Sequence, residues 1–222
     1  MSAIECFFSA QGKFYRTSKG LVVPSAGSIC TKLTNEDFSH VGIETLERAI
    51  QQGEGAHEVA CNYSLHVLGH LKKVTLPPMP AGHPDTEQHW DAAMTHALAQ
   101  VEKLFARYEV TPIAVEEKSI CSSYFYGGQP DVKLWMKWKG RKIVAVWDYK
   151  RIAAIALSHY LKIESYLMLD SFSDCSAGFI AWLKKGSDAE LIHCPRNGHY
   201  KAAIASAAGL LNFQIAHRVL KP

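Results

Sequence analysis

The chain has 222 residues, of which 48% are hydrophobic and 20% are charged, and its formal net charge at pH 7 is +3. This composition is typical of a globular domain with a hydrophobic core, and it excludes the disordered and fibrous classes of protein. The small net charge means that binding of nucleic acid would depend on a local basic surface, and no apolar run reaches the roughly 18 residues of a membrane span.

The first half of the sequence predicts a mainly helical segment. Residues 1–23 are expected to form a short β-hairpin or arm, after which Ser25 can cap a short helix. Gly53 and Gly55 are expected to break or bend the helical pattern that follows, and a proline-rich loop spans residues 76–84. The longer helices of this half are expected over residues 38–52, 56–73 and about 87–108.

From residue 110 the hydrophobic period changes toward that of β-strands. Strands are expected over residues 112–123, 131–139, 142–148, 179–183 and 190–194. Helices are expected over residues 151–169 and from Asn197 to about His217. Residues 143–147 are continuously apolar, which predicts a central strand covered on both faces. The order predicts a single α/β domain, a mixed central β-sheet flanked by helices, with a mainly helical part over residues 1–109 and the sheet core over 110–222.

A two-residue loop at Lys139 and Gly140 would join two of these strands into a hairpin. Residues would then pair when their numbers sum to 279, as 139 and 140 do, so Asp131 would face Asp148 directly. Opposed carboxylates repel each other, and a hard divalent cation such as Mg²⁺ between them would relieve the repulsion. Lys150 follows Asp148 by two positions, so strand alternation points it to the same face. The hairpin therefore predicts two metal ligands and an ammonium group at one place.

The order Pro130-Asp131, hairpin, then Asp148-X-Lys150 resembles the PD-(D/E)XK nuclease superfamily, and most closely its phage exonuclease, RecB-nuclease and Cas4-like branch. Gly53-Glu54-Gly55-Ala56-His57 is similar to the early helix motif of that branch, in which a histidine joins the metal site. Glu116 stands fifteen positions before Asp131, where the branch usually carries a glutamate. The resemblance implies a restriction-endonuclease-like core that uses Mg²⁺ or Mn²⁺.

The same resemblance implies roles for the residues of the site. Asp131 and Asp148 would hold the metal, with the Tyr149 carbonyl and the His57 imidazole as further ligands, and Mn²⁺ accepts imidazole more readily than Mg²⁺ does. Lys150 would orient the attacking water, help to deprotonate it, or stabilise the charged phosphate in the transition state. Replacing either aspartate is expected to abolish cleavage and to leave the fold intact or more stable, because one of two facing charges is removed.

Two further groups of residues are candidates for contacting DNA. Lys162 and Tyr166 lie four apart on one predicted helical face, where the branch has glutamine and tyrosine that approach the scissile phosphate, so the tyrosine matches and the lysine departs from the pattern. A basic strand face with an interleaved aromatic side chain could bind a phosphate backbone and stack a base, and a solvated hairpin is the alternative. This face is formed by Lys133, Trp135, Lys137 and Lys139.

The sequence therefore predicts a metal-dependent deoxyribonuclease, an exonuclease on DNA ends or single strands, in the phage or mobile-element recombination context that the resemblance implies. A structure-specific or nicking endonuclease and a non-cleaving DNA-binding accessory protein are the alternatives. DNA is the expected partner, with a homo-oligomer or a recombination protein as a further possibility. The N-terminus lacks the features of a signal peptide, which predicts the cytoplasm, or the host cytoplasm for a phage protein. The six cysteines show no Cys-X-X-Cys spacing, so neither a zinc ribbon nor a disulfide framework is indicated.

Overall fold

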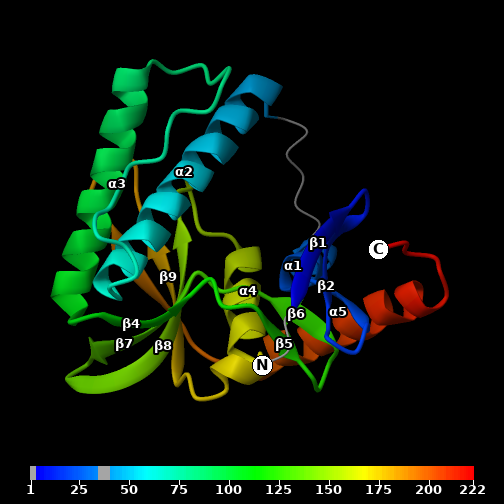
Figure 1. Ribbon diagram of the computed structural model, residues 1–222. Helices are drawn as coiled ribbons and strands as arrows, with labels where there is room; N and C mark the ends of the chain where they lie inside the picture. The colour runs from blue at the N-terminus through cyan, green and yellow to red at the C-terminus, as the bar shows by residue number, and fades with distance from the viewer. Residues whose placement is uncertain (1–3, 35–40) are drawn as a thin grey trace.

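A five-stranded mixed sheet lies at the centre of the computed structural model, which describes residues 4–34 and 41–222 (Figure 1). The strand order is β10-β9-β8-β7-β4, with β8 and β9 parallel and the other neighbours antiparallel. The strands are β4 (Thr111–Val115), β7 (Val132–Trp138), β8 (Arg141–Lys150), β9 (Ala177–Trp182) and β10 (Glu190–Cys194). The apolar strand β8 is central, as its continuous hydrophobic run predicts.

Helices cover both faces of this sheet (Figure 1). On one face α2 and α3 lie side by side, and Phe105 of α3 packs edge-on against Trp147 of β8 at 6.0 Å between ring centroids. On the other face Ile163 of α4 packs with Val146 of β8, in a second core that α1 and α5 share. The helices are α1 (Ala26–Thr34), α2 (Ile43–Val67), α3 (Glu87–Tyr108), α4 (Leu157–Leu167) and α5 (Gly198–Ala216). The predicted α/β class, a mixed sheet flanked by helices, is confirmed.

The hairpin of β7 and β8 has the register that the sequence predicts. Val132 pairs with Trp147 and Trp138 pairs with Arg141, and the numbers of both pairs sum to 279. Lys139 and Gly140 form the two-residue turn with φ angles of 48° and 78°. Positive φ at both positions is typical of the turn type whose twist matches that of the flanking strands.

Two smaller sheets stand beside the main one. The strands β1, β2 and β3 confirm the hairpin expected in residues 1–23 and add a third strand to it, while β5 pairs with β6. Their bounds are β1 (Glu5–Ser9), β2 (Gly12–Arg16), β3 (Val22–Pro24), β5 (Ser119–Cys121) and β6 (Tyr126–Gly128). The Ser28 N–H donates to Ser25 Oγ at 3.0 Å, so the predicted cap of α1 is confirmed. A β-bridge between Ser25 and Gly127 links the two small sheets.

The predicted break at the two glycines is wrong, because α2 runs without interruption from Ile43 to Val67. A Cβ atom at Gly55 would lie 2.7 Å from the Trp90 ring of α3, so this glycine allows α2 and α3 to approach closely. Gly53 faces open space, where the cost of a glycine is only the small loss of helix propensity. Residues 38–40 of the first predicted helix lie outside the described residues, and α2 ends at Val67 instead of residue 73.

Two other predicted elements are shorter in the structure. The strand expected over 112–123 is divided, because Glu116 follows β4 with a φ of 50° and the chain turns into the separate strand β5. The helix expected over 151–169 begins only at Leu157. Residues 151–156 follow β8 without helical structure, and the Ile152 carbonyl accepts from Trp182 Nε1 at the end of β9 at 2.8 Å. Both corrections arise from contacts between distant parts of the chain.

The two glycines of α2 provide a matched test of this packing. Gly53→Ala is expected to stabilise the protein by about 0.4–1 kcal/mol, because alanine restricts the unfolded chain and meets no neighbour. Gly55→Ala is expected to destabilise it by about 1–3 kcal/mol, since Trp90 is 1% exposed and its Nε1 is bonded to the Pro77 carbonyl at 2.8 Å. Urea unfolding of both variants measures the difference. Equal stability changes would contradict close packing at Gly55.

Among the described residues, none of the helices has both the length and the apolar character that crossing a membrane requires.

Candidate active site

Asp131 connects three elements at the start of β7. Its Oδ1 lies 3.1 Å from His57 Nε2 on α2, and its Oδ2 accepts a hydrogen bond of 2.6 Å from the Tyr149 N–H of β8. Its backbone carbonyl accepts from the Glu116 N–H at 2.9 Å. Asp131 is buried and lines a cavity of about 300 Å³ that His57 and Glu116 also line. The structure thus brings together His57, Glu116 and Asp131, three predicted site residues that are far apart in the sequence.

Asp148 is fully buried and is held by two ammonium groups. Lys150 forms an ion pair with its Oδ2, and Lys162 Nζ lies 3.1 Å from its Oδ1. No other donor in the described part of the chain reaches these oxygens. Burial alone would raise the pKa of Asp148, but the two ammonium groups outweigh it and hold the pKa well below its usual value. Asp148 is therefore an anion in the folded protein.

Lys162 and Tyr166 of α4 lie where the sequence places them, on the side of the site opposite α2. The Lys162 ammonium is 5.4 Å from the centroid of the Tyr166 ring, and both side chains line the same cavity as Asp131. Burial opposes the charge of Lys162, but the carboxylate of Asp148 raises its pKa well above the usual value. A lysine in place of the glutamine of the family pattern thus brings a second positive charge onto Asp148.

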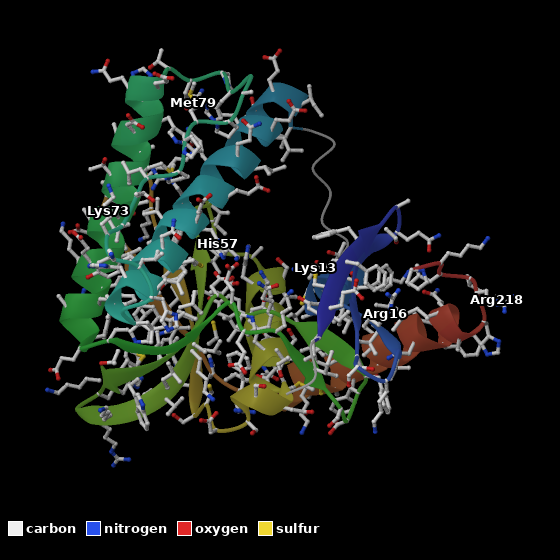
Figure 2. All side chains as sticks on the ribbon, viewed as in Figure 1. Lys13, Arg16, His57, Lys73, Met79 and Arg218 are labelled. Carbon is white, nitrogen blue, oxygen red and sulfur yellow. The ribbon has the colours of Figure 1, made fainter. Side chains whose placement is uncertain are left out.

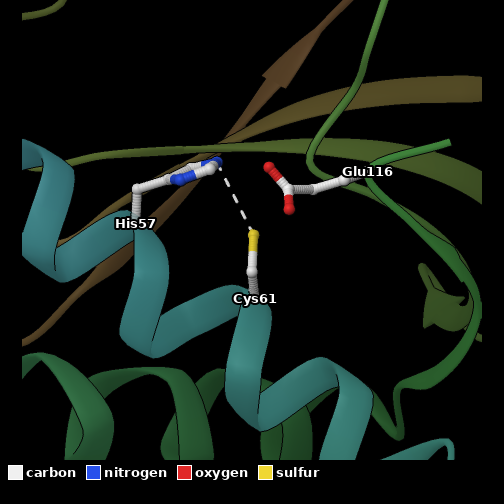
Figure 3. Close-up of side chains that lie close together, drawn as sticks. All are labelled: His57, Cys61 and Glu116. Carbon is white, nitrogen blue, oxygen red and sulfur yellow. Dashed lines mark hydrogen bonds between the residues drawn. The ribbon is translucent and has the colours of Figure 1, made fainter. Parts of the chain in front are cut away.

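His57 and Glu116 form a cluster with a residue that the sequence reasoning missed. Figure 3 shows the His57 imidazole, the Cys61 thiol and the Glu116 carboxylate directed toward one another, with His57 Nε2 at 3.6 Å from Cys61 Sγ. The ligand atoms of the three residues lie within 4.8 Å of one another. Cys61 follows His57 by four positions, the spacing that places two side chains on one helical face, and this was the signal that could have found it.

The electrostatics of this cluster favour a cation. Burial opposes the charge of His57, but the carboxylates of Asp131 and Glu116 outweigh burial and raise its pKa above the usual value. Burial and the same two carboxylates raise the pKa of Cys61, so the thiol keeps its proton. The carboxylate and imidazole donors fit a divalent ion such as Mn²⁺ or Mg²⁺, and a deprotonated Cys61 would add affinity for a softer metal.

The Tyr149 peptide group lies between the two parts of the site. Its N–H is the donor to Asp131, and its carbonyl accepts a hydrogen bond of 3.1 Å from Lys150 Nζ. The Tyr149 hydroxyl pairs with Ser64 Oγ on α2 at 3.0 Å, which anchors this part of β8 beneath the helix. The carbonyl that the resemblance implies as a metal ligand therefore accepts a hydrogen bond from Lys150 of the same motif.

The basic face of the hairpin lies apart from this site. Lys133 pairs with Asp174 at 2.6 Å, and Lys137 pairs with Glu109 at 2.8 Å, so two of its charges are already balanced. Trp135 is 39% exposed, and Lys139 lies in the turn at the far end of the strand. At a rise of roughly 3.3 Å per residue, Lys137 is about 20 Å along β7 from Asp131. The side chains of β7 alternate as predicted. A DNA strand bound at Asp131 would contact Lys137 only if it extended about 20 Å along the hairpin.

His57 on α2 and Lys13 on β2, both labelled in Figure 2, line the same 300 Å³ cavity. Lys13, Ser25 and Gln129 line the 300 Å³ cavity together with Asp131. The sheet of β1, β2 and β3 therefore forms a wall of the site, a role that the sequence did not predict for the N-terminal residues.

Comparison with known proteins finds no family model that matches the chain and no match among curated proteins. Solved structures do match, among them one described as the crystal structure of SSO0001. That chain is 12% identical to this one, and the match covers 87% of this chain and 85% of the other with a TM-score of 0.35. At this TM-score the similarity assigns neither a fold nor a function to the chain.

Proposed function

We propose that this protein is a metal-dependent deoxyribonuclease that hydrolyses phosphodiester bonds, acting as an exonuclease on DNA ends or single strands. The observation that supports this most directly is the hairpin register, which pairs the β7 and β8 strands so that Asp131, Asp148 and Lys150 meet at one end of the sheet. His57 and Glu116 add an imidazole and a carboxylate beside Asp131. The proposal places the chain in the PD-(D/E)XK superfamily that its motifs resemble.

Asp131, Asp148 and His57 would hold a divalent metal ion, Mg²⁺ or Mn²⁺. When bound, such an ion lowers the pKa of a coordinated water and neutralises charge on the phosphate. Lys150 is 18% exposed at its side chain, so its ammonium can remain on Asp148 and still reach the attacked phosphate. There it balances the charge that develops in the transition state or positions the attacking water. Lys162, which pairs with Asp148, would contact a phosphate oxygen as a point charge.

Digestion of three DNA substrates tests this function. End-labelled single strands and duplexes are expected to shorten progressively with Mg²⁺ or Mn²⁺, whereas a covalently closed circle should resist because it offers no end. Gel electrophoresis of a time course distinguishes the outcomes. Cleavage of the closed circle would favour the endonuclease alternative, and no cleavage of any substrate with either ion would contradict the proposal.

One observation favours the non-cleaving alternative, a DNA-binding accessory protein. Lys162 occupies an oxygen of Asp148 that a metal would use, and the family pattern has a neutral glutamine at that position. Calorimetry with Mn²⁺ separates the two candidates, because a nuclease must bind the ion at this site whereas an accessory protein has no need to. Binding that disappears in the Asp131→Asn variant would favour the nuclease.

A further inference from the structure

A groove of about 1540 Å³ leads away from the candidate active site. His57, Glu116 and Lys150 line it at one end, so the groove and the site are continuous. From there it runs between α2 and the non-helical segment 151–156, toward the residues 184–187 that follow β9. The groove is five times as large as the 300 Å³ cavity around Asp131, and a chain-like ligand could lie along it.

Arg151 lies in this groove and carries a buried charge without an acceptor. The residue directly follows Lys150 and is 8% exposed. Its Nε and Nη1 atoms are inaccessible to solvent and have no hydrogen-bond partner in the part of the chain that the structure describes. A buried guanidinium without partners costs free energy that a folded protein seldom carries without a use, and an anion is the ligand that would satisfy it. A planar fork of N–H groups matches the geometry of a phosphate.

The charges around Arg151 are also positive. Burial lowers the pKa of Lys185, which follows β9, and the charges of Arg151 and of Arg48 on α2 lower it further, while Asp85 acts in the opposite direction. Asp85 is already paired with Arg48 and accepts from Gln52 Nε2 at 2.7 Å. Neither Arg151 nor Lys185 forms an ion pair with a carboxylate in the described part of the chain, so this end of the groove attracts an anion.

The wall formed by α2 is apolar toward the N-terminus of the helix, whereas the exposed Glu54 and Glu58 line it nearer the candidate active site. Leu46, Ala49 and Ile50 line the groove, and Ile50 is 50% exposed. Trp182 lines it near the cationic end and is partly buried. Unpaired bases can lie on such apolar and aromatic surfaces while basic residues follow the phosphates, whereas in a duplex the bases are stacked inside the helix.

From these observations we infer that the groove binds a single-stranded DNA segment whose end enters the candidate active site, with one phosphate held by Arg151 and another by Lys185. The inference rests on the proposed function and adds to it the substrate class and the residues that select it. Arg151 acts as a binding residue next to the reacting phosphate, and the apolar residues Leu46, Ala49 and Ile50 of α2 accept the bases of the same strand.

Binding of fluorescein-labelled oligo(dT) tests the inference, measured by fluorescence anisotropy in EDTA over a series of salt concentrations. Arg151→Gln is expected to weaken binding by about tenfold or more, since it removes the charged hydrogen bond between the guanidinium and a phosphate of the bound DNA. The slope of log affinity against log salt should become shallower by about 0.7 for each phosphate that the variant no longer neutralises. Arg107→Gln, an exposed change on the far surface of α3, is the matched control and should leave both quantities unchanged.

Stability separates a binding role of Arg151 from a structural one. Arg151→Gln should keep or raise the melting temperature, because it removes an unpaired buried charge. Arg151→Lys keeps the charge but lacks the planar fork, so it should retain only part of the affinity. Lys185→Gln changes an exposed residue and should weaken binding and flatten the salt slope, whether or not the Arg151 variants fold.

Wild-type affinity and salt slope in Arg151→Gln, or in Lys185→Gln if the former does not fold, would overturn the inference. So would a sharp fall of the melting temperature in Arg151→Gln with unchanged binding by Lys185→Gln, or tighter binding of a duplex of equal length than of oligo(dT). The measurement needs no metal and no cleavage. If the protein cleaves DNA but these variants bind oligo(dT) like wild type, the groove proposal alone is rejected. If oligo(dT) binding depends on Arg151 but no DNA is cleaved, the nuclease proposal alone is rejected.

Discussion

Lys150→Ala is expected to lower the single-turnover rate of DNA cleavage by roughly two orders of magnitude or more, the scale of losing one electrostatic stabiliser. Its ammonium pairs with Asp148 and donates to the Tyr149 carbonyl at 3.1 Å, so it lies where charge would build on the phosphate. Affinity for Mn²⁺ should survive, because the carboxylates and His57 remain and Lys162 still balances Asp148. Rapid-quench cleavage and Mn²⁺ titration measure the two quantities separately.

Two variants serve as controls for Lys150→Ala. His57→Ala should have the opposite effect: Mn²⁺ affinity should fall, and excess Mn²⁺ should partly restore the cleavage rate. The reason is that this variant lacks the imidazole donor beside Asp131. Lys118→Ala, at an exposed position between β4 and β5, should change neither quantity. A Lys150→Ala protein that cleaves DNA at nearly the wild-type rate would exclude the proposed mechanism and most of the family assignment with it.

Asp131→Asn and Asp148→Asn are each expected to abolish cleavage, but with different effects on stability. An asparagine at 131 can still accept from the Tyr149 N–H, so this variant should unfold close to wild type. An asparagine at 148 leaves Lys150 and Lys162 without their anion. The cost should be about 1–3 kcal/mol, less than for a fully buried pair because both lysines reach solvent. Urea unfolding, together with cleavage in Mn²⁺, measures both effects.

For Asp148 this expectation reverses the one drawn from the sequence, in which removing either facing carboxylate relieves repulsion and leaves the fold intact or more stable. The structure shows that Asp148 faces two cations, so the repulsion is already balanced in the metal-free protein. The double variant Asp148→Asn with Lys162→Gln should recover part of the lost stability, since one unpaired ammonium is removed. Equal stability of Asp148→Asn and wild type would show that the two lysines do not depend on Asp148.

The sequence by itself determined the hairpin and most of the elements around it, because their signals are local. The turn at Lys139 and Gly140 and the alternation of β7 set the register, and a shift by one residue would have turned the Val132 side chain out of the core. The same local reasoning found the final helix, which begins after Asn197, whose side chain accepts from the His199 N–H at 2.9 Å. The family resemblance added His57 and Glu116 from their positions in the chain.

Only the tertiary structure decided how these pieces meet. Gly55 lies inside the continuous helix α2, where the absence of a side chain allows the Trp90 ring of α3 to approach closely, and the sequence pattern did not reveal this contact. The pairing of Lys162 with Asp148, the place of Cys61 beside Glu116 and the burial of Arg151 without an acceptor likewise join separate elements. Periodicity and turn chemistry report on neighbours within about one turn or one strand pair, whereas ion pairs, close helix contacts and buried charges arise when whole elements pack together.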